Sequence, residues 1–439
     1  MPKKYKRRIK KAPTDVVGLY MDLQRQQEYP REYGTDLRHF HLSLEIGDEM
    51  LNYFVIRKAG YGHSSIVWLC FDKSVRKFRA LKVMKHGVAY NRELKMLTTV
   101  RQHDDKPGSD KVVMLLNAFP FGSPMHYVMV FEPLGMSLLA LMQRSHSGFE
   151  IPVVKKLLQH TLEGLHFLHT EIGCIHSDIK PENIMISVSE RSFYLETQKV
   201  VERKYNGLGM RASNAPKGRP ILSKKSKDFF QTILGLCPES SDEPLNQYEM
   251  PHDGSPAQFL RYRHLVQRRA VATELLNPST VFKIGDLGNA MQIVCNLATF
   301  EYRPPENIFL MELSGTFDIW GIAATALETV LQDIIFRPID DEREQNNRKL
   351  YQRMLDILGD YDGSAFADTP AYQEMETELR PSEAIHQSSV DNIRQHLLTY
   401  GFKYDEIDEL SQLLSCLFVF DGKKRFTAAQ ALSHKFFAD

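Results

Sequence analysis

The first part of the chain alternates short apolar runs with polar turns, which is the pattern of a β-sheet. The runs are rich in Val, Ile and Phe, residues that favour extended backbone. Leu94 and Leu97 stand at helical spacing after the third run and predict one helix among the strands. The predicted strands are 54–59, a run ending at Leu69, 78–84, 112–116 and 127–131.

From residue 137 onward the apolar spacing becomes helical. A short helix is predicted over 137–145, and the stretch 153–169 places its Val and Leu residues on one face of a longer one. Residues 322–331 are apolar on nearly all faces, which predicts a helix buried in a large lobe. Strands followed by helices indicate an α+β protein.

Between these regions the pattern stops for much of residues 189–279. The segment has few apolar clusters and many Gly, Pro, Ser, Lys and Arg residues, and its middle, 217–227, is basic. This composition predicts an inserted spacer that is largely disordered. Residues 261–276 are the exception, because their apolar spacing suits a helix.

The composition excludes several classes of protein. The chain has 439 residues, with 55 Lys and Arg against 55 Asp and Glu, so no global charge favours nucleic acid or a membrane. No apolar run reaches the roughly 18 residues of a membrane span. The five cysteines form no CxxC pair, which argues against a structural zinc site and suits a reducing compartment.

Residues 1–30 form a basic tail, with no apolar segment of the kind that a secretory signal needs. Two interpretations remain open, a solvated disordered tail and a nuclear-import or RNA-contacting segment. The charges are Lys3, Lys4, Lys6, Arg7, Arg8, Lys10 and Lys11.

The stretch 175–186 carries the strongest candidate chemistry. Asp178 precedes Lys180 by two residues and Asn183 by five, between apolar flanks. Phosphoryl transfer uses this spacing, because the Asp orients a substrate hydroxyl, the Lys offsets phosphate charge and the Asn holds a metal ion. The alternative is a polar turn between two strands.

Two further segments supply partners for this loop. Gly60 and Gly62 lie in a hairpin whose backbone N–H groups can approach phosphates, although such a hairpin alone is a weak signal. Lys82 stands inside an apolar strand, where an ammonium needs a carboxylate partner, and Glu93 on the predicted helix is the candidate. Glu93 could also be an exposed helix charge.

An apolar strand ending in Asp286-Leu287-Gly288 gives a second candidate metal ligand, Asp286. Structural roles are predicted for Asp318, as an acceptor for the backbone of the catalytic loop, and for Arg425, as the partner of Glu306. Thr427 and Gln430 predict a helix capping box.

In order along the chain, these motifs resemble the SR-protein kinases of the CMGC group. The passages are 55–58, 67–70, 129–135, 176–183 and 284–290, together with the long spacer and the lead-in Tyr33-Gly34 to Ile46-Gly47-Asp48. The resemblance implies a bilobal kinase fold: a lead-in at 31–52, a β-rich N-lobe with helix αC at 53–135, and a mostly helical C-lobe at 136–188 and 280–439, with the spacer at 189–279 between its parts.

The resemblance also implies ATP-dependent phosphorylation of Ser in Arg/Ser-rich splicing factors, with Asp178 and Lys180 as catalytic residues. Mg²⁺ would be held by Asn183 and Asp286, and the backbone near Glu132 would be the hinge that faces adenine. We expect a monomer in cytoplasm and nucleus that needs neither nucleic acid nor membrane. The implied ATP-binding residues are Gly60, Gly62, Val67, Ala80, Lys82, Glu93, Glu132, Leu134 and Met185.

Two departures modify this expectation, and the first concerns the activation segment. Ser177 replaces the Arg that in most kinases binds a phosphorylated activation segment, and the only hydroxyl residues between Asp286 and Glu306 are Thr299 and Tyr302. Thr299 resembles the residue that bonds Asp178 and Lys180 in Ser/Thr kinases. We therefore predict constitutive activity without activation-segment phosphorylation.

The second departure concerns substrate docking. SR-protein kinases carry an acidic stretch where this chain has Asn346-Asn347-Arg348-Lys349, and the nearby acids are Asp340, Asp341, Glu342, Glu344 and Asp356. Arg348 and Lys349 would repel an Arg-rich ligand. Two alternatives remain open beside this function: another CMGC kinase, of the Clk or dual-specificity type with basic or Pro-directed substrates, and a pseudokinase scaffold.

Overall fold

The computed structural model describes residues 44–61, 65–84, 87–122, 125–145, 148–206, 224–237, 272–290, 298–337, 346–361, 363–379 and 388–438. The basic tail, Gly62 and the acids at 340–344 lie outside these residues.

Within the described residues, an antiparallel sheet of six strands forms the first lobe, in the order β1-β2-β3-β4-β6-β5. Helix α2 (Gly87–Arg101) follows β4, as the spacing of Leu94 and Leu97 predicted. The strands are β1 (Glu49–Met50), β2 (Tyr53–Tyr61), β3 (Ser65–Asp72), β4 (Lys77–Met84), β5 (Leu115–Phe121) and β6 (His126–Phe131).

The prediction of a strand over 112–116 was wrong in its bounds. Residues Ser109–Lys111 form a 3-10 turn, and Val112 bridges to Ile284 of the other lobe instead of entering the sheet. β5 begins only at Leu115. Val112 pairs with Ile284 instead, which explains why β5 begins later than predicted. Apolar content indicates that a segment is buried but does not show which strand it pairs with.

Alternation along the strands sends side chains into two separate cores. Ile66 and Trp68 of β3 enter one core with Leu81, whereas Leu69 and Phe71 enter another on the opposite face of the sheet. Both faces of the sheet are therefore covered.

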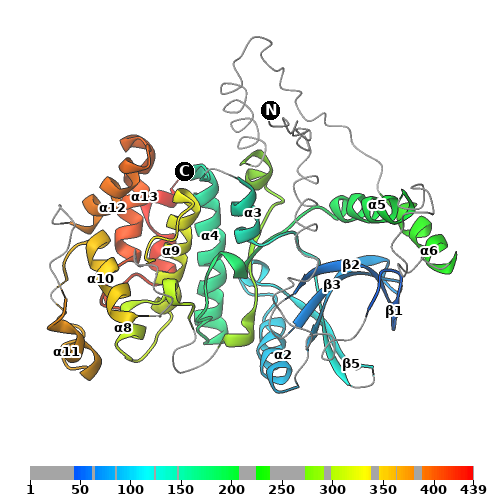
Figure 1. The fold of residues 1–439 in the computed structure, drawn as a ribbon, viewed down its shortest axis with the longest axis horizontal. Coiled ribbons are helices and arrows are strands. Elements are labelled where there is room, and N and C mark those ends of the chain that lie inside the picture. Colours follow the sequence, from blue (N-terminus) through cyan, green and yellow to red (C-terminus); the bar gives the residue numbers. More distant parts are fainter. Residues whose placement is uncertain are drawn as a thin grey trace, which may run out of the picture.

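The second lobe is mainly helical, and Figure 1 shows its helices gathered around α4 and α9. α9 is buried along its whole length, as its apolar sequence predicted, and the capping box of Thr427 and Gln430 is present. The helices are α3 (Leu138–Ser145), α4 (Ile151–Phe167), α8 (Pro305–Ile308), α9 (Thr316–Leu331), α10 (Asn347–Leu358), α11 (Pro370–Glu376), α12 (Ser389–Thr399), α13 (Tyr404–Leu417) and α14 (Ala428–Leu432).

Two short strands, β7 (Ile184–Ile186) and β8 (Phe282–Ile284), form an antiparallel ribbon at the boundary between the lobes. β7 begins directly after Asn183 of the predicted catalytic loop, and β8 ends two residues before Asp286. The ribbon therefore brings together two motifs that the insert separates in sequence.

The prediction of a largely disordered spacer was wrong for much of its described part. Residues Glu190–Asn206 form α5 and Lys224–Leu234 form α6, and Figure 1 shows both helices beside the sheet of the first lobe. Phe193, Phe230 and Ile233 pack on the second core of the sheet. The prediction rested on the average composition of the spacer, which is polar, and these few apolar residues change that average too little to be noticed. Of the helix predicted at 261–276, residues 272–276 are helical and the rest lie outside the described residues.

No helix among the described residues is long and apolar enough to cross a membrane.

Candidate active site

The loop that carries Asp178 is held by one buried carboxylate. Asp318, 1% exposed, accepts hydrogen bonds from the backbone N–H groups of His176 and Ser177, each at 2.8 Å. Its Oδ2 also lies 2.8 Å from His169 Nε2. Ser177 has a φ of 69°, a strained conformation for a residue with a side chain, and these bonds hold it there. The predicted acceptor role of Asp318 is confirmed.

The side chain of Asp178 is oriented by contacts at both carboxylate oxygens. Oδ1 accepts from Thr299 Oγ1 at 2.8 Å and from Thr299 N at 3.1 Å. Oδ2 lies 2.7 Å from Lys180 Nζ and 3.1 Å from Asn183 Nδ2. Lys180 Nζ also donates to Thr299 Oγ1 at 2.6 Å. The predicted bonds of Thr299 to Asp178 and Lys180 are thus both present.

Lys82 has the carboxylate partner that its place in β4 required. Its Nζ lies 2.6 and 2.8 Å from the two oxygens of Glu93 on α2, and 3.3 Å from Asp286 Oδ1. Burial favours the neutral amine, but the two carboxylates outweigh it and raise the pKa of Lys82. The ammonium therefore stays charged beside Asp286.

Asp286 projects from a left-handed backbone, with φ of 58°. Burial by itself raises the pKa of this carboxyl, and the nearby Lys82 and His176 lower it further than burial raises it. Gly288 lies beside both carboxylates, and a Cβ there would be in ordinary van der Waals contact, 3.4 Å from Asp286 Oδ1 and 3.5 Å from Glu93 Oε2. The carboxylate is therefore ionised and held close to α2.

The backbone before Asp286 is tied to the catalytic loop. Gly285 N donates to Asn183 O at 2.8 Å, and His176 Nε2 lies 2.9 Å from Gly285 O. Sequence reasoning gave His176 no role. Its place two residues before the catalytic Asp was the only available signal.

The predicted nucleotide-contacting residues come from both lobes. Gly60 pairs with Val67 across β2 and β3, and Val67 pairs with Lys82 across β3 and β4. Ala80 pairs with Phe131, next to Glu132 and Leu134. Met185 lies on β7, where it forms a bridge with Ser137. The structure thus places Gly60, Val67, Ala80 and Lys82 in the sheet and Met185 in the other lobe. Glu132 and Leu134 follow the end of β6, and Gly62 falls outside the described residues.

The predicted structural pair Glu306 and Arg425 is also present. Arg425 donates from Nη1 to Glu306 Oε1 at 2.7 Å and from Nη2 to Oε2 at 2.9 Å, with both residues buried. This two-pronged contact fixes the end of the activation segment to the C-terminal part of the lobe.

Comparison with known proteins agrees with this geometry. Residues 53–197 and 274–437 match the protein kinase domain family. The chain belongs to the protein kinase family. The unmatched residues between the two parts include α6 and fall within the predicted insert.

Several curated relatives are similar over most of this chain. The serine/threonine-protein kinase spk-1 of Caenorhabditis elegans is 27% identical over 94% of this chain, which spans only 50% of that relative. Protein kinase dsk1 of Schizosaccharomyces pombe is 26% identical over 95% of this chain and 87% of its own length. Human SRSF protein kinase 3 is 25% identical over 96% and 92%.

These findings confirm three predictions: the α+β protein kinase fold, the resemblance to the SRPK kinases, and the enzyme class of serine/threonine protein kinase. Kinase domains in general use ATP and a divalent metal ion.

Within the described part of the chain, no group of three or more His, Cys, Asp or Glu side chains gathers to hold a metal ion. Two protein oxygens nevertheless suit a hard cation that completes its shell with water and phosphate. Asp286 offers an ionised carboxylate, and Asn183 donates its amide N–H to Asp178, which leaves its amide oxygen to act as a ligand. The residues present therefore fit the metal that the fold implies.

Proposed function

We propose that this chain is an ATP- and Mg²⁺-dependent kinase that phosphorylates Ser in Arg/Ser-rich tails of splicing factors. The observation that carries the proposal is the closed set of contacts among Asp178, Lys180 and Thr299. The substrate class is supported by the names of relatives such as human SRSF protein kinase 3.

Asp178 orients the substrate hydroxyl and accepts its proton as the oxygen attacks phosphorus. Because Thr299 and Lys180 bond its two oxygens, the carboxylate has one defined direction before substrate arrives. Lys180 is close enough to Asp178 to offset negative charge on the transferred phosphoryl group. Thr299 joins both residues, which favours Ser and Thr over the longer Tyr as acceptor.

Mg²⁺ and ATP supply the electrophilic phosphoryl group and neutralise part of its charge. Lys82, fixed by Glu93, would bind the α- and β-phosphates of ATP, and the glycine turn predicted at Gly60 would let backbone N–H groups approach them. Asp286 and Asn183 would hold the metal. Val67, Ala80, Leu134 and Met185 would enclose the adenine, and the backbone near Glu132 would meet its polar edge.

Docking of an Arg-rich tail has more support in the structure than the sequence suggested. Asn346 caps α10 by accepting from Arg348 N and Lys349 N, so it has a structural role. Arg348 Nη1 lies 2.5 Å from Glu378 Oε2, which offsets its charge. The repulsion inferred from Arg348 is therefore smaller than the sequence alone implied.

The remaining expectations belong to the same proposal: activity without activation-segment phosphorylation, a monomer, and action in cytoplasm and nucleus with no need for nucleic acid or membrane.

The test is ³²P transfer from ATP to three matched peptides, with Arg-Ser repeats, Lys-Ser repeats and Ser-Pro sites. We expect the Arg-Ser peptide to be phosphorylated with the highest kcat/KM. Asp178→Asn, which keeps the size of the side chain, should lower kcat by about 10²-fold or more. Preference for Ser-Pro would favour the Clk-like alternative. Equal phosphate transfer by wild type and Asp178→Asn would overturn the catalytic assignment of Asp178, and background transfer by wild type on all three peptides would favour the pseudokinase scaffold.

A further inference from the structure

The side chain of Glu132 joins three segments where the two lobes meet. Its Oε1 lies 2.6 Å from Lys283 Nζ of β8 and accepts from Met114 N, just before β5, at 3.3 Å. Glu132 itself directly follows β6. The side chains of Lys283 and Glu132 are 13% and 28% exposed, so solvent screens this pair less than an ordinary surface pair.

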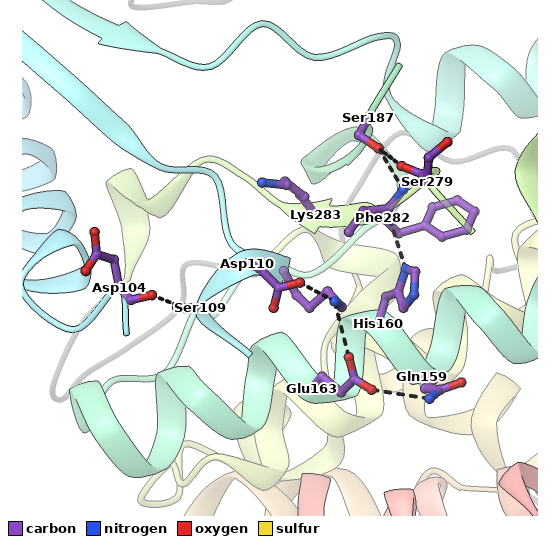
Figure 2. Close-up of polar contacts among 12 residues, drawn as sticks. Asp104, Ser109, Asp110, Gln159, His160, Glu163, Ser187, Ser279, Phe282 and Lys283 are labelled. Carbon is purple, nitrogen blue, oxygen red and sulfur yellow. Dashed lines mark hydrogen bonds and ion pairs between the residues drawn. The ribbon is translucent and has the colours of Figure 1, made fainter. Parts of the chain in front are cut away.

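Lys283 projects from the face of β8 that carries the nucleotide-site residues. It lies directly opposite Met185 in the β7–β8 ribbon, and residues paired in this way share a face. Figure 2 shows Lys283 pointing away from Phe282 and His160, which lie on the other side of the strand. Phe282 is fully buried there.

β8 is itself fixed to the catalytic loop through Gly285, and Lys283 stands three residues before Asp286. The ion pair therefore connects the strand that delivers the metal ligand to the segment that follows β6. Val113 N, which donates to Ile284 O at 2.9 Å, adds a backbone contact between the same two regions. Without Lys283, the Glu132 carboxylate keeps only its contact with Met114 N among these partners.

We propose that Glu132 and Lys283 are positioning residues that hold the hinge, residues 131–135, over Met185 and thereby set the affinity for ATP. This inference rests on the proposed function, since it takes residues 131–135 as the adenine-facing hinge. It assigns the Glu132 side chain a role separate from its backbone. Loss of the pair would let the hinge move relative to β8, so ATP would have to order it on binding.

The experiment compares Lys283→Met, Glu132→Gln and the double variant. We expect the Kd for a fluorescent ATP analogue and the KM for ATP to rise about three- to tenfold in each single variant. The double variant should be no weaker than the worse single variant, because both break one interaction. The kcat of Lys283→Met at saturating ATP should stay within about twofold of wild type, which a general loss of structure would not allow.

Lys73→Met is the matched control, because Lys73 Nζ lies 2.7 Å from Glu49 Oε2 at the distant edge of the sheet. Its Kd for the analogue should not change. Lys283→Arg keeps the pair and should retain affinity, which guards against loss by misfolding. Unchanged Kd in both single variants, or additive losses in the double variant, would overturn the proposal. Binding of the ATP analogue needs no peptide substrate. The result can therefore be interpreted even if the proposed Arg/Ser-rich substrate class is incorrect.

Discussion

At the scale of single residues, charged groups buried in this protein have specific partners. Asp318 accepts from two backbone N–H groups, Lys82 is paired with Glu93, and Arg425 is paired with Glu306. A buried charge without a partner costs several kcal/mol of folding free energy. Removing one member of such a pair should therefore destabilise the protein strongly.

Arg425→Met should lower the free energy of unfolding by about 3–5 kcal/mol, because it leaves the Glu306 carboxylate buried without its partner. Urea denaturation measures this change. Lys424→Met, at an exposed neighbour, should cost less than about 1 kcal/mol. The double variant Arg425→Met with Glu306→Gln should recover part of the loss. A cost for Arg425→Met as small as that of the control would contradict a structural role of the pair.

His160 gives the protein a defined acid sensitivity. Its Nδ1 accepts from Phe282 N at 3.2 Å, a contact visible in Figure 2. Burial, with Lys111 and Lys156 nearby, lowers the pKa of His160 to about 4. Between the ordinary His value of about 6.5 and this value, the unfolded chain binds more protons than the folded one. The stability that neutral His160 contributes is therefore fully present above pH 6.5 and is lost as pH falls toward 4.

His160→Asn retains an acceptor near Nδ1 but does not titrate. We expect the Tm of this variant to fall less between pH 7 and pH 5 than the Tm of wild type, as measured by circular dichroism. An equal fall in both proteins would show that other groups cause the acid sensitivity.

At the scale of elements, the insert helices complete the first lobe. Phe230 of α6 is fully buried and makes an edge contact with Phe54 of β2, with ring centroids 5.0 Å apart. Arg57 of β2 pairs with Glu196 of α5 at 2.6 Å, a few residues before the Gly60 turn. α5 and α6 therefore cover β2, the strand that leads to the Gly60 turn.

Phe230→Ala should cost about 3–5 kcal/mol of folding free energy, because it removes a large side chain from a closed aromatic cluster. Gln231→Ala, at the exposed neighbouring position, should change stability by no more than about 0.5 kcal/mol. Thermal and urea unfolding of both variants provide the test. If Phe230→Ala matched the control, α6 would not be part of the folded core.

At the scale of the whole molecule, the described hydroxyl groups of the activation segment are already bonded. Thr299 Oγ1 donates to Asp178, and Tyr302 OH donates to Glu328 Oε2 at 2.5 Å. Ser177 Oγ donates to Asn289 O at 3.1 Å, where most kinases have an Arg for phosphate. A phosphate on Thr299 or Tyr302 would break these contacts, so we expect neither residue to be a site of activating phosphorylation.

Purified enzyme treated with phosphatase should therefore keep its kcat within about twofold, in an assay run after the phosphatase is removed. Mass spectrometry before and after treatment verifies that phosphate was present and was lost. A fall to background activity would contradict constitutive activity.

The sequence by itself determined the order and spacing of the chemical groups. Asp178, Lys180 and Asn183 lie within six residues, so local backbone geometry already brings them together. The strand around Lys82 and the buried helix α9 could be predicted from the pattern of apolar residues, because a buried segment must carry apolar side chains on each face that packs against the core.

Only the tertiary structure decided which distant segments meet. Asp286 reaches Lys82 from 204 residues away, and Lys283 reaches Glu132 from 151. Nothing in the local pattern marks Lys283 as the partner of Glu132, since an exposed Lys in a strand has the same sequence context. The insert shows the same limit: α5 and α6 are polar on average, and their few aromatic residues became a core only where the sheet offered Phe54 and Phe78. Long-range packing, which composition averages away, made that choice.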